Sequence, residues 1–296
     1  MTETPVLMPL YMPFTEAQMA NIRLGYVPVA MEQKWFTYFA DSALHIYRSW
    51  TGFYMFRIHF EPRTDGWRAT HAGINMDPLE PEPGPPLHPR PDEHGKPVKI
   101  KHPSTPTKLC AWHDTHQSAT VIPDGPMPTQ INGVPFAPWA DAPTTLIGWK
   151  KVPGQMGDLV EPLLHVGAGK HAAAGVVVEE ADGRVWIVHP SNGFGGYSAT
   201  FPKGRADALG SHLQAVAIRE AHEEAGLQVQ ITGFLADSQR TMTTTRYYLA
   251  RRVGGNPADM GWESQAVSLV PRAVLPSLLT NSNDAPLLKA LLKQAD

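Results

Sequence analysis

The chain has 296 residues, with 29 prolines, 25 glycines, one cysteine and a formal net charge of −3. Eighteen prolines fall between Pro78 and Pro162, which excludes a helical bundle or coiled coil there, because each interior proline costs about 3 kcal/mol of helix stability. Glycine shows no period of three, which excludes collagen, and the length suggests about two domains.

The residue composition and net charge also restrict the cellular compartment and the binding partners that we expect for this protein. The single Cys110 excludes a disulfide framework and a zinc site built from several thiolates, and it favours a reducing cytoplasm. The first twenty residues contain no lysine or arginine, and no apolar run approaches the roughly 18 residues of a membrane helix. The near-neutral charge argues against nucleic acid as a partner. We therefore expect a soluble, cytoplasmic protein.

Residues 30–62 are rich in aromatic and β-branched side chains. Three short runs separated by turn residues predict an antiparallel β-meander. The runs are Trp35–Phe39, Leu44–Arg48 and Gly52–Phe60. We expect the aromatic side chains to form a core, because few basic residues interleave with them as a base-stacking surface would require. This region is assigned to a small β-rich N-terminal domain over residues 1–77.

Residues 78–165 are assigned to a proline-rich connector. Seven of the fourteen residues from Pro78 to Pro91 are proline, which predicts an extended segment, with a polyproline ligand for another protein as the alternative. Tryptophans at 112, 139 and 149 indicate irregular structure that packs on a neighbour. Cys110, His113 and His116 lack enough partners at metal-ligand spacing to predict zinc.

A different pattern begins near residue 168. The runs Ala172–Val178 and Val185–Val188 flank a turn and predict a β-hairpin, which a glycine-rich loop and a short strand at 198–201 follow. Helices are expected at 211–225 and 285–294, and strands near 228–235, 243–252 and 266–270. Strands mixed with two helices predict an α/β sandwich over residues 166–296.

The predicted helix 211–225 has sequence signals at both ends. Ser211 and Gln214 match a capping box, and Gly226 suits the left-handed residue that follows a helix. The other notable feature of this helix is its acidic face.

Glu220, Glu223 and Glu224 fall within about 100° of the helix surface. Like charges at this spacing destabilise a helix by about 0.2–0.5 kcal/mol a pair, and only Arg219 lies nearby to offset them. Gathered carboxylates suit a divalent cation, because Mg²⁺ prefers oxygen ligands. A solvated acidic face is the alternative.

These residues carry a resemblance to a known family. Arg219-Glu220-Ala-His-Glu223-Glu224-Ala-Gly226-Leu227 resembles the second half of the Nudix box, G-x5-E-x7-R-E-U-x-E-E-x-G-U, at every fixed position. Two departures occur in the first half. Gly204 lies one residue too far from Arg219, and Ser211 stands where the family has its first glutamate. The resemblance covers about residues 170–296.

The resemblance implies an α/β/α sandwich that hydrolyses a nucleoside diphosphate linked to another moiety. It implies Mg²⁺, or Mn²⁺ in its place, held by Glu220, Glu223 and Glu224. A bound cation would neutralise the diphosphate and lower the pKa of bound water. We expect Arg219 to orient Glu223 or a neighbouring carboxylate through a charge-assisted hydrogen bond.

Further site residues are expected around the box. Lys203 and Gly204, in a Pro-Lys-Gly sequence that resembles the family's strand-to-loop entry, are assigned to substrate binding together with Arg246. The family often supplies a general base from a later loop, and Glu263 is our candidate for that base or for an extra metal ligand, with Asp259 next. Arg240 is a weaker candidate for binding a polyphosphate. Weaker candidates for stacking on the nucleobase of the substrate are Phe194, Tyr197 and Trp262.

The substrate is expected to be a small nucleotide. ADP-ribose is the first choice, followed by a dinucleoside polyphosphate or a modified nucleotide, although no proline lies between Pro202 and Pro257 where the ADP-ribose subgroup often has one. The alternative is a non-catalytic Nudix module that senses ADP-ribose or a nucleotide and regulates through its N-terminal partner. The first 165 residues resemble no family that we can name; lining the site, forming a homodimer or carrying a separate activity all stay open.

Overall fold

The computed structural model describes residues 7–26, 35–48, 54–74, 86–191, 196–206 and 212–293. The chain divides into two compact units, Met1–Pro85 and Pro86–Asp296. The domain boundaries that we expect after residues 77 and 165 stay a prediction. Most of the proline-dense segment before Pro86 lies outside the described residues.

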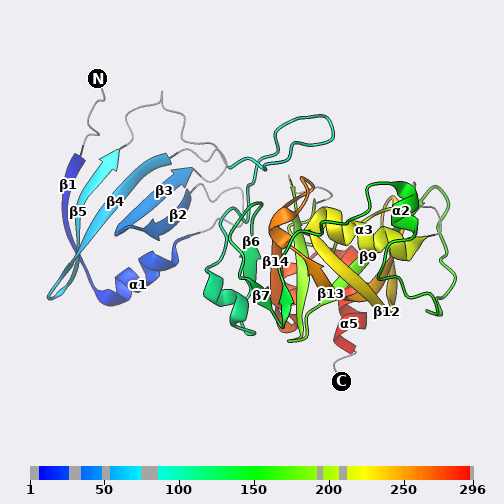
Figure 1. Ribbon diagram of the computed structural model, residues 1–296. Coiled ribbons are helices and arrows are strands. Elements are labelled where there is room, and N and C mark those ends of the chain that lie inside the picture. The colour runs from blue at the N-terminus through cyan, green and yellow to red at the C-terminus, as the bar shows by residue number, and fades with distance from the viewer. Residues whose placement is uncertain are drawn as a thin grey trace. The chain divides into compact units, whose positions relative to one another are not determined.

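Within the described residues, the first unit is a five-stranded antiparallel sheet with one helix (Figure 1). Its elements are β1 (Leu7–Phe14), α1 (Glu16–Leu24), β2 (Trp35–Ala40), β3 (Ala43–Arg48), β4 (Tyr54–Arg63) and β5 (Gly66–Ile74). The strand order is β1-β5-β4-β3-β2. The β-rich N-terminal region is therefore confirmed, while Gly52, expected in the third strand, lies outside the described residues.

The aromatic side chains of this unit do not all enter its core. Met19 of α1 is buried with Phe60, and Phe39 packs against Phe60 with a centroid distance of 5.9 Å. Tyr38 and Tyr47 stack on each other at 5.7 Å, and Tyr38 is exposed. Neighbouring residues of a strand point to opposite faces, so the expected aromatic core forms on one face of the sheet.

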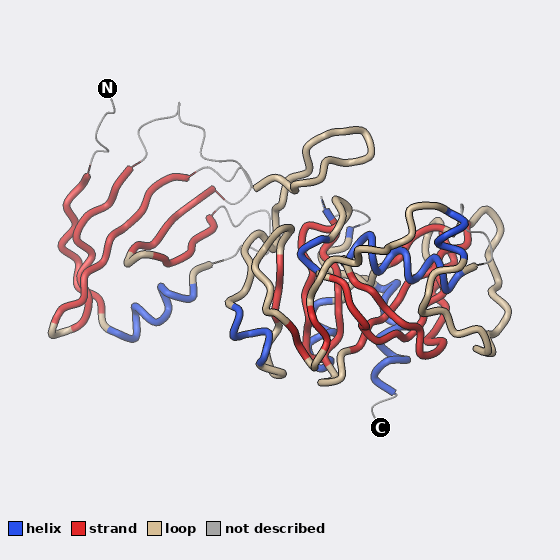
Figure 2. Tube along the Cα trace, in the orientation of Figure 1, coloured by secondary structure: helices blue, strands red, loops and turns tan. Residues whose placement is uncertain are grey.

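Seven described strands of the second unit form a mixed sheet in the order β12-β13-β9-β10-β14-β6, with β11 beside β9, and β7 and β8 form a separate two-stranded sheet. The first elements are β6 (Ala119–Val121), β7 (Gln130–Ile131), β8 (Val134–Pro135), α2 (Leu146–Lys150), β9 (His171–Glu179), β10 (Arg184–Pro190) and β11 (Lys203–Arg205). The later ones are α3 (Leu213–Ala225), β12 (Leu227–Gln239), β13 (Thr243–Gly255), β14 (Ser264–Pro271), α4 (Leu275–Leu278) and α5 (Ala285–Lys293). Figure 2 shows long loops between the short elements that precede β9.

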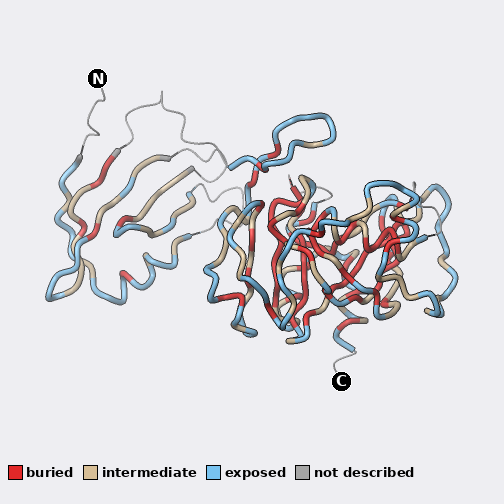
Figure 3. The backbone as a smooth tube through the Cα atoms, in the orientation of Figure 1, coloured by how far each residue is buried: buried red, intermediate tan, exposed pale blue. Residues whose placement is uncertain are grey.

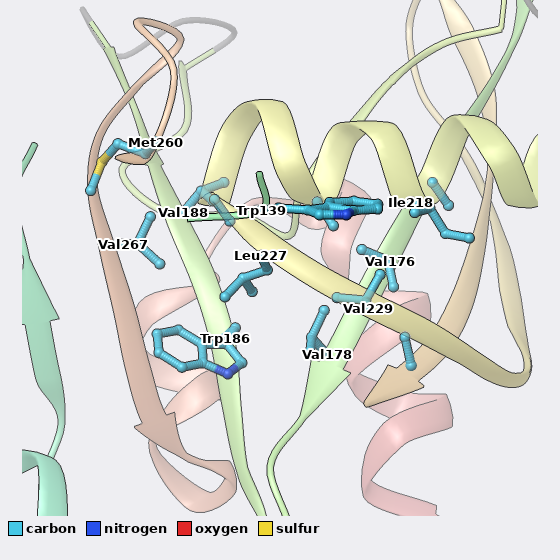
Figure 4. Close-up of a cluster of buried hydrophobic side chains, with 14 of the residues drawn as sticks. Trp139, Val176, Val178, Trp186, Val188, Ile218, Leu227, Val229, Met260 and Val267 are labelled. Carbon is cyan, nitrogen blue, oxygen red and sulfur yellow. The ribbon is translucent and has the colours of Figure 1, made fainter. Parts of the chain in front are cut away.

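A helix covers each face of this sheet. Val176 and Val178 of β9 belong to the cluster that contains Ile218 of α3, whereas Val177, which points the other way, packs with Leu287 and Leu291 of α5. Figure 4 shows the first cluster, and Figure 3 shows the buried strands between more exposed loops. The expected α/β/α sandwich is therefore confirmed.

The elements expected after residue 168 are present with shifted ends. One expected strand is wrong: of residues 198–201 only Thr200 makes an isolated bridge, to Val188, and the short strand is β11 instead. The chain crosses here from the edge of β10 to that of β9, where β11 pairs with Ala173–Gly175.

The helix α3 ends as expected and begins differently. Gly226 adopts a left-handed conformation with φ of 64° and caps the helix. The helix begins at Leu213, after His212, and Ser211 lies outside the described residues. Gln214, the other half of the expected capping box, instead accepts a hydrogen bond from the Met156 backbone at 2.7 Å.

Residues 86–165 pack on this sandwich. Trp112, Trp139 and Trp149 lie in the same hydrophobic cluster as Ile218, and β6 pairs with β14 at the sheet edge. In the part of the chain that the structure describes, no helix is both long and apolar enough to cross a bilayer.

Candidate active site

The helix α3 places two of its glutamates, Glu220 and Glu224, beside β11. Ala217, Ile218 and Ala221 are fully buried against the strands, which fixes the rotation of the helix. Glu220 and Glu224 are consequently buried, at 5% and 7% exposure, whereas Glu223 is exposed. The three carboxylates therefore span the boundary between the protein interior and solvent.

The two buried glutamates have different partners. Arg219 donates to Glu220 Oε1 at 2.6 Å and pairs with Glu223 Oε2 at 3.3 Å. Glu224 Oε2 accepts a hydrogen bond from the backbone N–H of Lys203 at 2.9 Å. Arg219 thus makes the contacts that we expect of a residue orienting the glutamates, and β11 holds Glu224 through its main chain.

Burial raises the pKa values of Glu220 and Glu224 and so disfavours their ionised forms. Burial, assisted by the charge of Glu224 and opposed by Arg219, raises the pKa of Glu220 to about 8. Burial also raises the pKa of Glu224 to about 7, against the opposing effect of Lys203. A protein that uses both as carboxylates near neutral pH needs additional positive charge beside them.

Gly204 explains how Glu220 fits beneath β11. A Cβ atom at Gly204 would overlap the carboxylate of Glu220. The absence of a side chain at this residue therefore leaves the volume that the carboxylate occupies. Gly204 thus lies beside Glu220, while Lys203 binds Glu224 through its backbone.

Glu263 lies in the loop before β14, and this loop contacts α3 directly. The Gly261 N–H donates to the Glu223 carbonyl at 2.7 Å. Desolvation by the surrounding protein raises the pKa of the exposed Glu263, and Lys203 and Arg219 oppose that rise. The charges of Lys203 and Arg219 therefore favour the ionised form of Glu263.

Arg246 is placed differently. Its guanidinium donates to both oxygens of Asp237 at 2.9 Å and to Glu161 Oε2 at 3.0 Å, and its side chain is 4% exposed. Two carboxylates therefore occupy the donors that we assigned to a substrate phosphate, and contact with substrate would require their displacement.

The remaining candidates are also engaged. Arg240 donates to Tyr247 and Asp284 at 2.7 Å, and it lies over the ring of Tyr197 at 5.2 Å. Tyr197 is buried, so its ring is not offered to a base in this arrangement. Phe194 lies outside the described residues.

The suitability of the glutamates for a metal depends on their chemistry. As arranged, no group of three His, Cys, Asp or Glu side chains among the described residues is set to hold a metal ion. The donors themselves fit Mg²⁺: they are oxygen ligands on consecutive turns, and two are buried with raised pKa values that a cation would lower.

No sequence signal indicated the residues that attach the preceding segment to this site. Glu161 accepts hydrogen bonds from Tyr248, Gln214 and Arg246, and Arg252 donates to Glu180 at 2.5 Å and to the backbone of β7 and β8. Arg90 contacts residues 169 and 170 positions later. No local spacing signals such long-range pairs.

Comparisons with known proteins give the following matches. The NUDIX domain family model matches residues 169–291. A NUDIX hydrolase structure from Nitrosomonas europaea is 20% identical, with a TM-score of 0.37, and covers 44% of this chain and 74% of its own. An ADP-ribose pyrophosphatase from Streptococcus suis is 22% identical, with a TM-score of 0.35, over 42% of this chain and 91% of its own. A C. elegans Ap4A hydrolase complex is 21% identical, with a TM-score of 0.35, over 42% and 97%. No curated protein sequence matches the chain significantly.

Proposed function

Because residues 169–291 of this chain form a Nudix domain, we propose that the protein hydrolyses the diphosphate linkage of a nucleoside diphosphate derivative with the help of Mg²⁺. The observation that carries this proposal is the burial of Glu220 and Glu224 beside the exposed Glu223 on one face of α3. Carboxylates are costly to bury, and the single guanidinium of Arg219 does not offset the charge of both glutamates, which favours a site that binds a cation.

Each protein group has a defined part in this proposal. Glu220, Glu223 and Glu224 would hold Mg²⁺, with Mn²⁺ as a substitute, and the bound ion would neutralise the diphosphate and acidify water. Arg219 fixes the orientation of Glu220. Lys203 brings a positive charge near Glu224 and Glu263, where an anionic phosphate would enter. Glu263 is the proposed general base.

The test is a hydrolysis assay on the full chain. Purified protein with Mg²⁺ or Mn²⁺ is incubated with ADP-ribose, dinucleoside polyphosphates and modified nucleotides, and the products are separated by mass. We expect a nucleoside monophosphate from at least one compound, with ADP-ribose tried first. An intact panel with both metals would refute the proposal, and ligand-induced thermal stabilisation without turnover would support the nucleotide-sensing alternative.

A further inference from the structure

The segment 86–101, which precedes the Nudix domain in the chain, is a hairpin that supports its own shape. The backbones of His88 and Val98 pair at 2.8 Å, and Leu87 and Lys99 form an antiparallel bridge. At the tip, Asp92 accepts hydrogen bonds from the backbone N–H groups of His94 and Lys96. The hairpin is therefore held in shape by hydrogen bonds within itself.

This hairpin binds the Glu263 loop on both sides of Glu263. On one side, Arg90 Nη1 donates to the Asp259 carbonyl at 2.6 Å and to the Met260 carbonyl at 3.2 Å. On the other side, Gln265 Oε1 accepts from the Lys101 N–H at 2.7 Å, and Gln265 Nε2 donates to the His102 carbonyl at 2.8 Å.

The loop between these two contacts has little freedom against α3. The Gly261 N–H binds the Glu223 carbonyl, and a Cβ at Gly261 would lie 2.5 Å from that oxygen. The Glu263 carbonyl accepts from the Ser191 N–H at 2.8 Å. A shift of the Arg90 contact would therefore move Gly261 and Glu263 relative to the helix that carries the glutamates.

The tip of the hairpin also reaches the electrostatic environment of the site. The charge of Glu93 contributes to the raised pKa of Glu263, after the larger effect of desolvation. The hairpin thus influences the pKa of Glu263 through the charge of Glu93, and it holds the loop that carries Glu263 through hydrogen bonds.

We propose that the hairpin 86–101 forms a wall of the diphosphate site and that Arg90 is a positioning residue that holds the Glu263 loop against α3. The inference rests on the proposed function. Arg90 is exposed, and its guanidinium donates to two backbone carbonyls of the loop, so its removal should leave the fold intact. The loss of activity that follows the removal of Arg90 should arise from the displacement of Glu263.

The experiment compares Arg90→Ala and Arg90→Lys with Arg251→Ala as a matched control. Arg251 is an exposed arginine that makes two hydrogen bonds to Gln230 on the neighbouring strand. We expect Arg90→Ala to lower kcat about tenfold, as losses of supporting contacts around metal sites do. Arg90→Lys should recover part of the loss through one hydrogen bond, and Arg251→Ala should match the unaltered protein.

A double-mutant cycle separates positioning from general stability. In a Glu263→Gln background, Arg90→Ala should cause no further loss, because the group that it positions is already gone. Hydrogen exchange should become faster in residues 256–265 of Arg90→Ala and stay unchanged elsewhere. Equal losses in both backgrounds, a fully active Glu263→Gln protein, or unchanged exchange in the loop would each overturn the inference.

The two proposals fail in distinguishable ways. If the unaltered protein cleaves nothing in the substrate panel, the proposed function fails, and the exchange of residues 256–265 together with Mn²⁺ affinity decides the inference. Weaker Mn²⁺ binding and faster loop exchange in Arg90→Ala, with neither in Arg251→Ala, would support the positioning role. No change in either measurement would refute it.

Discussion

The burial of Glu224 makes its substitution informative. Glutamine has nearly the same shape, so Glu224→Gln should preserve packing and the contact with the Lys203 N–H while removing a negative charge. We expect kcat to fall by about 10³-fold, equivalent to about 4 kcal/mol of transition-state stabilisation. Hydrolysis of the best substrate from the panel measures this. The control is Glu61→Gln, an exposed glutamate paired with Arg63 in the first unit, which should retain full activity.

The raised pKa values of Glu220 and Glu224 predict a pH effect on stability. Both groups bind protons more tightly in the folded protein, with pKa values of about 8 and about 7, than in the unfolded chain, where the ordinary value is 4.5. Stability in a chelator should therefore be complete below about pH 4.5 with respect to these groups and should be lost as the pH rises through about 7 to 8.

Thermal melts from pH 5 to 9 in EDTA measure this effect against a Glu220→Gln, Glu224→Gln double variant. The melting temperature of the unaltered protein should fall relative to the variant as the pH rises, and Mg²⁺ should restore it at pH 8 but not at pH 5. A constant difference between the two proteins across this range would contradict the prediction.

At the level of single residues, the sequence was most informative where a function requires local spacing. The box glutamates and Arg219 lie together because they share one helix, so their order alone predicts their proximity. Arg246 shows the opposite case. Its partners Asp237 and Glu161 come from another strand and from the preceding segment, and no spacing around Arg246 indicates that both would occupy its guanidinium.

At the level of elements, the fit between β11 and α3 can be tested through Gly204. In Gly204→Ala the new methyl group would displace the Glu220 carboxylate while the backbone, which has no positive φ here, accepts alanine. We expect at least a tenfold loss of activity with a weaker Mg²⁺ dependence, and little change in folding. Gly233→Ala in β12 is the matched control, because nothing lies near its added Cβ. Activity in both variants is measured across a Mg²⁺ titration.

The first and last residues of helices and strands depend on tertiary contacts, which the periodicity of hydrophobic residues in the sequence does not show. The alternation of Ala172–Val178 and the glycine at 226 indicated β9 and the end of α3 well. The start of α3 was harder to predict from the sequence, because Gln214 binds the Met156 backbone and Glu161 rather than its own helix terminus. A side chain can cap a helix or join two segments, and the sequence does not show which one it does.

At the level of the whole molecule, the resemblance to the Nudix box predicted the sandwich, whereas the contribution of residues 86–165 had to come from the structure. Their tryptophans indicated packing on a neighbour. The strand β6, however, is only three residues long, and its pairing with β14 depends on the hydrogen bond between Thr120 and Ser268 and on backbone register. Such short pairings lie below what alternation can indicate.

This packing predicts that residues 166–296 will not fold stably by themselves. Without residues 86–165, the surface that Trp112, Trp139 and Trp149 cover would be exposed. The buried Arg252 would also lose the three backbone carbonyls that it contacts. Loss of a large buried aromatic side chain alone costs about 3–5 kcal/mol, comparable with the stability of a whole domain. The test expresses residues 86–296 and 166–296 and compares their thermal unfolding and amide exchange. We expect a cooperative transition only for residues 86–296, and an equally cooperative transition for residues 166–296 would show that the preceding segment is dispensable for folding.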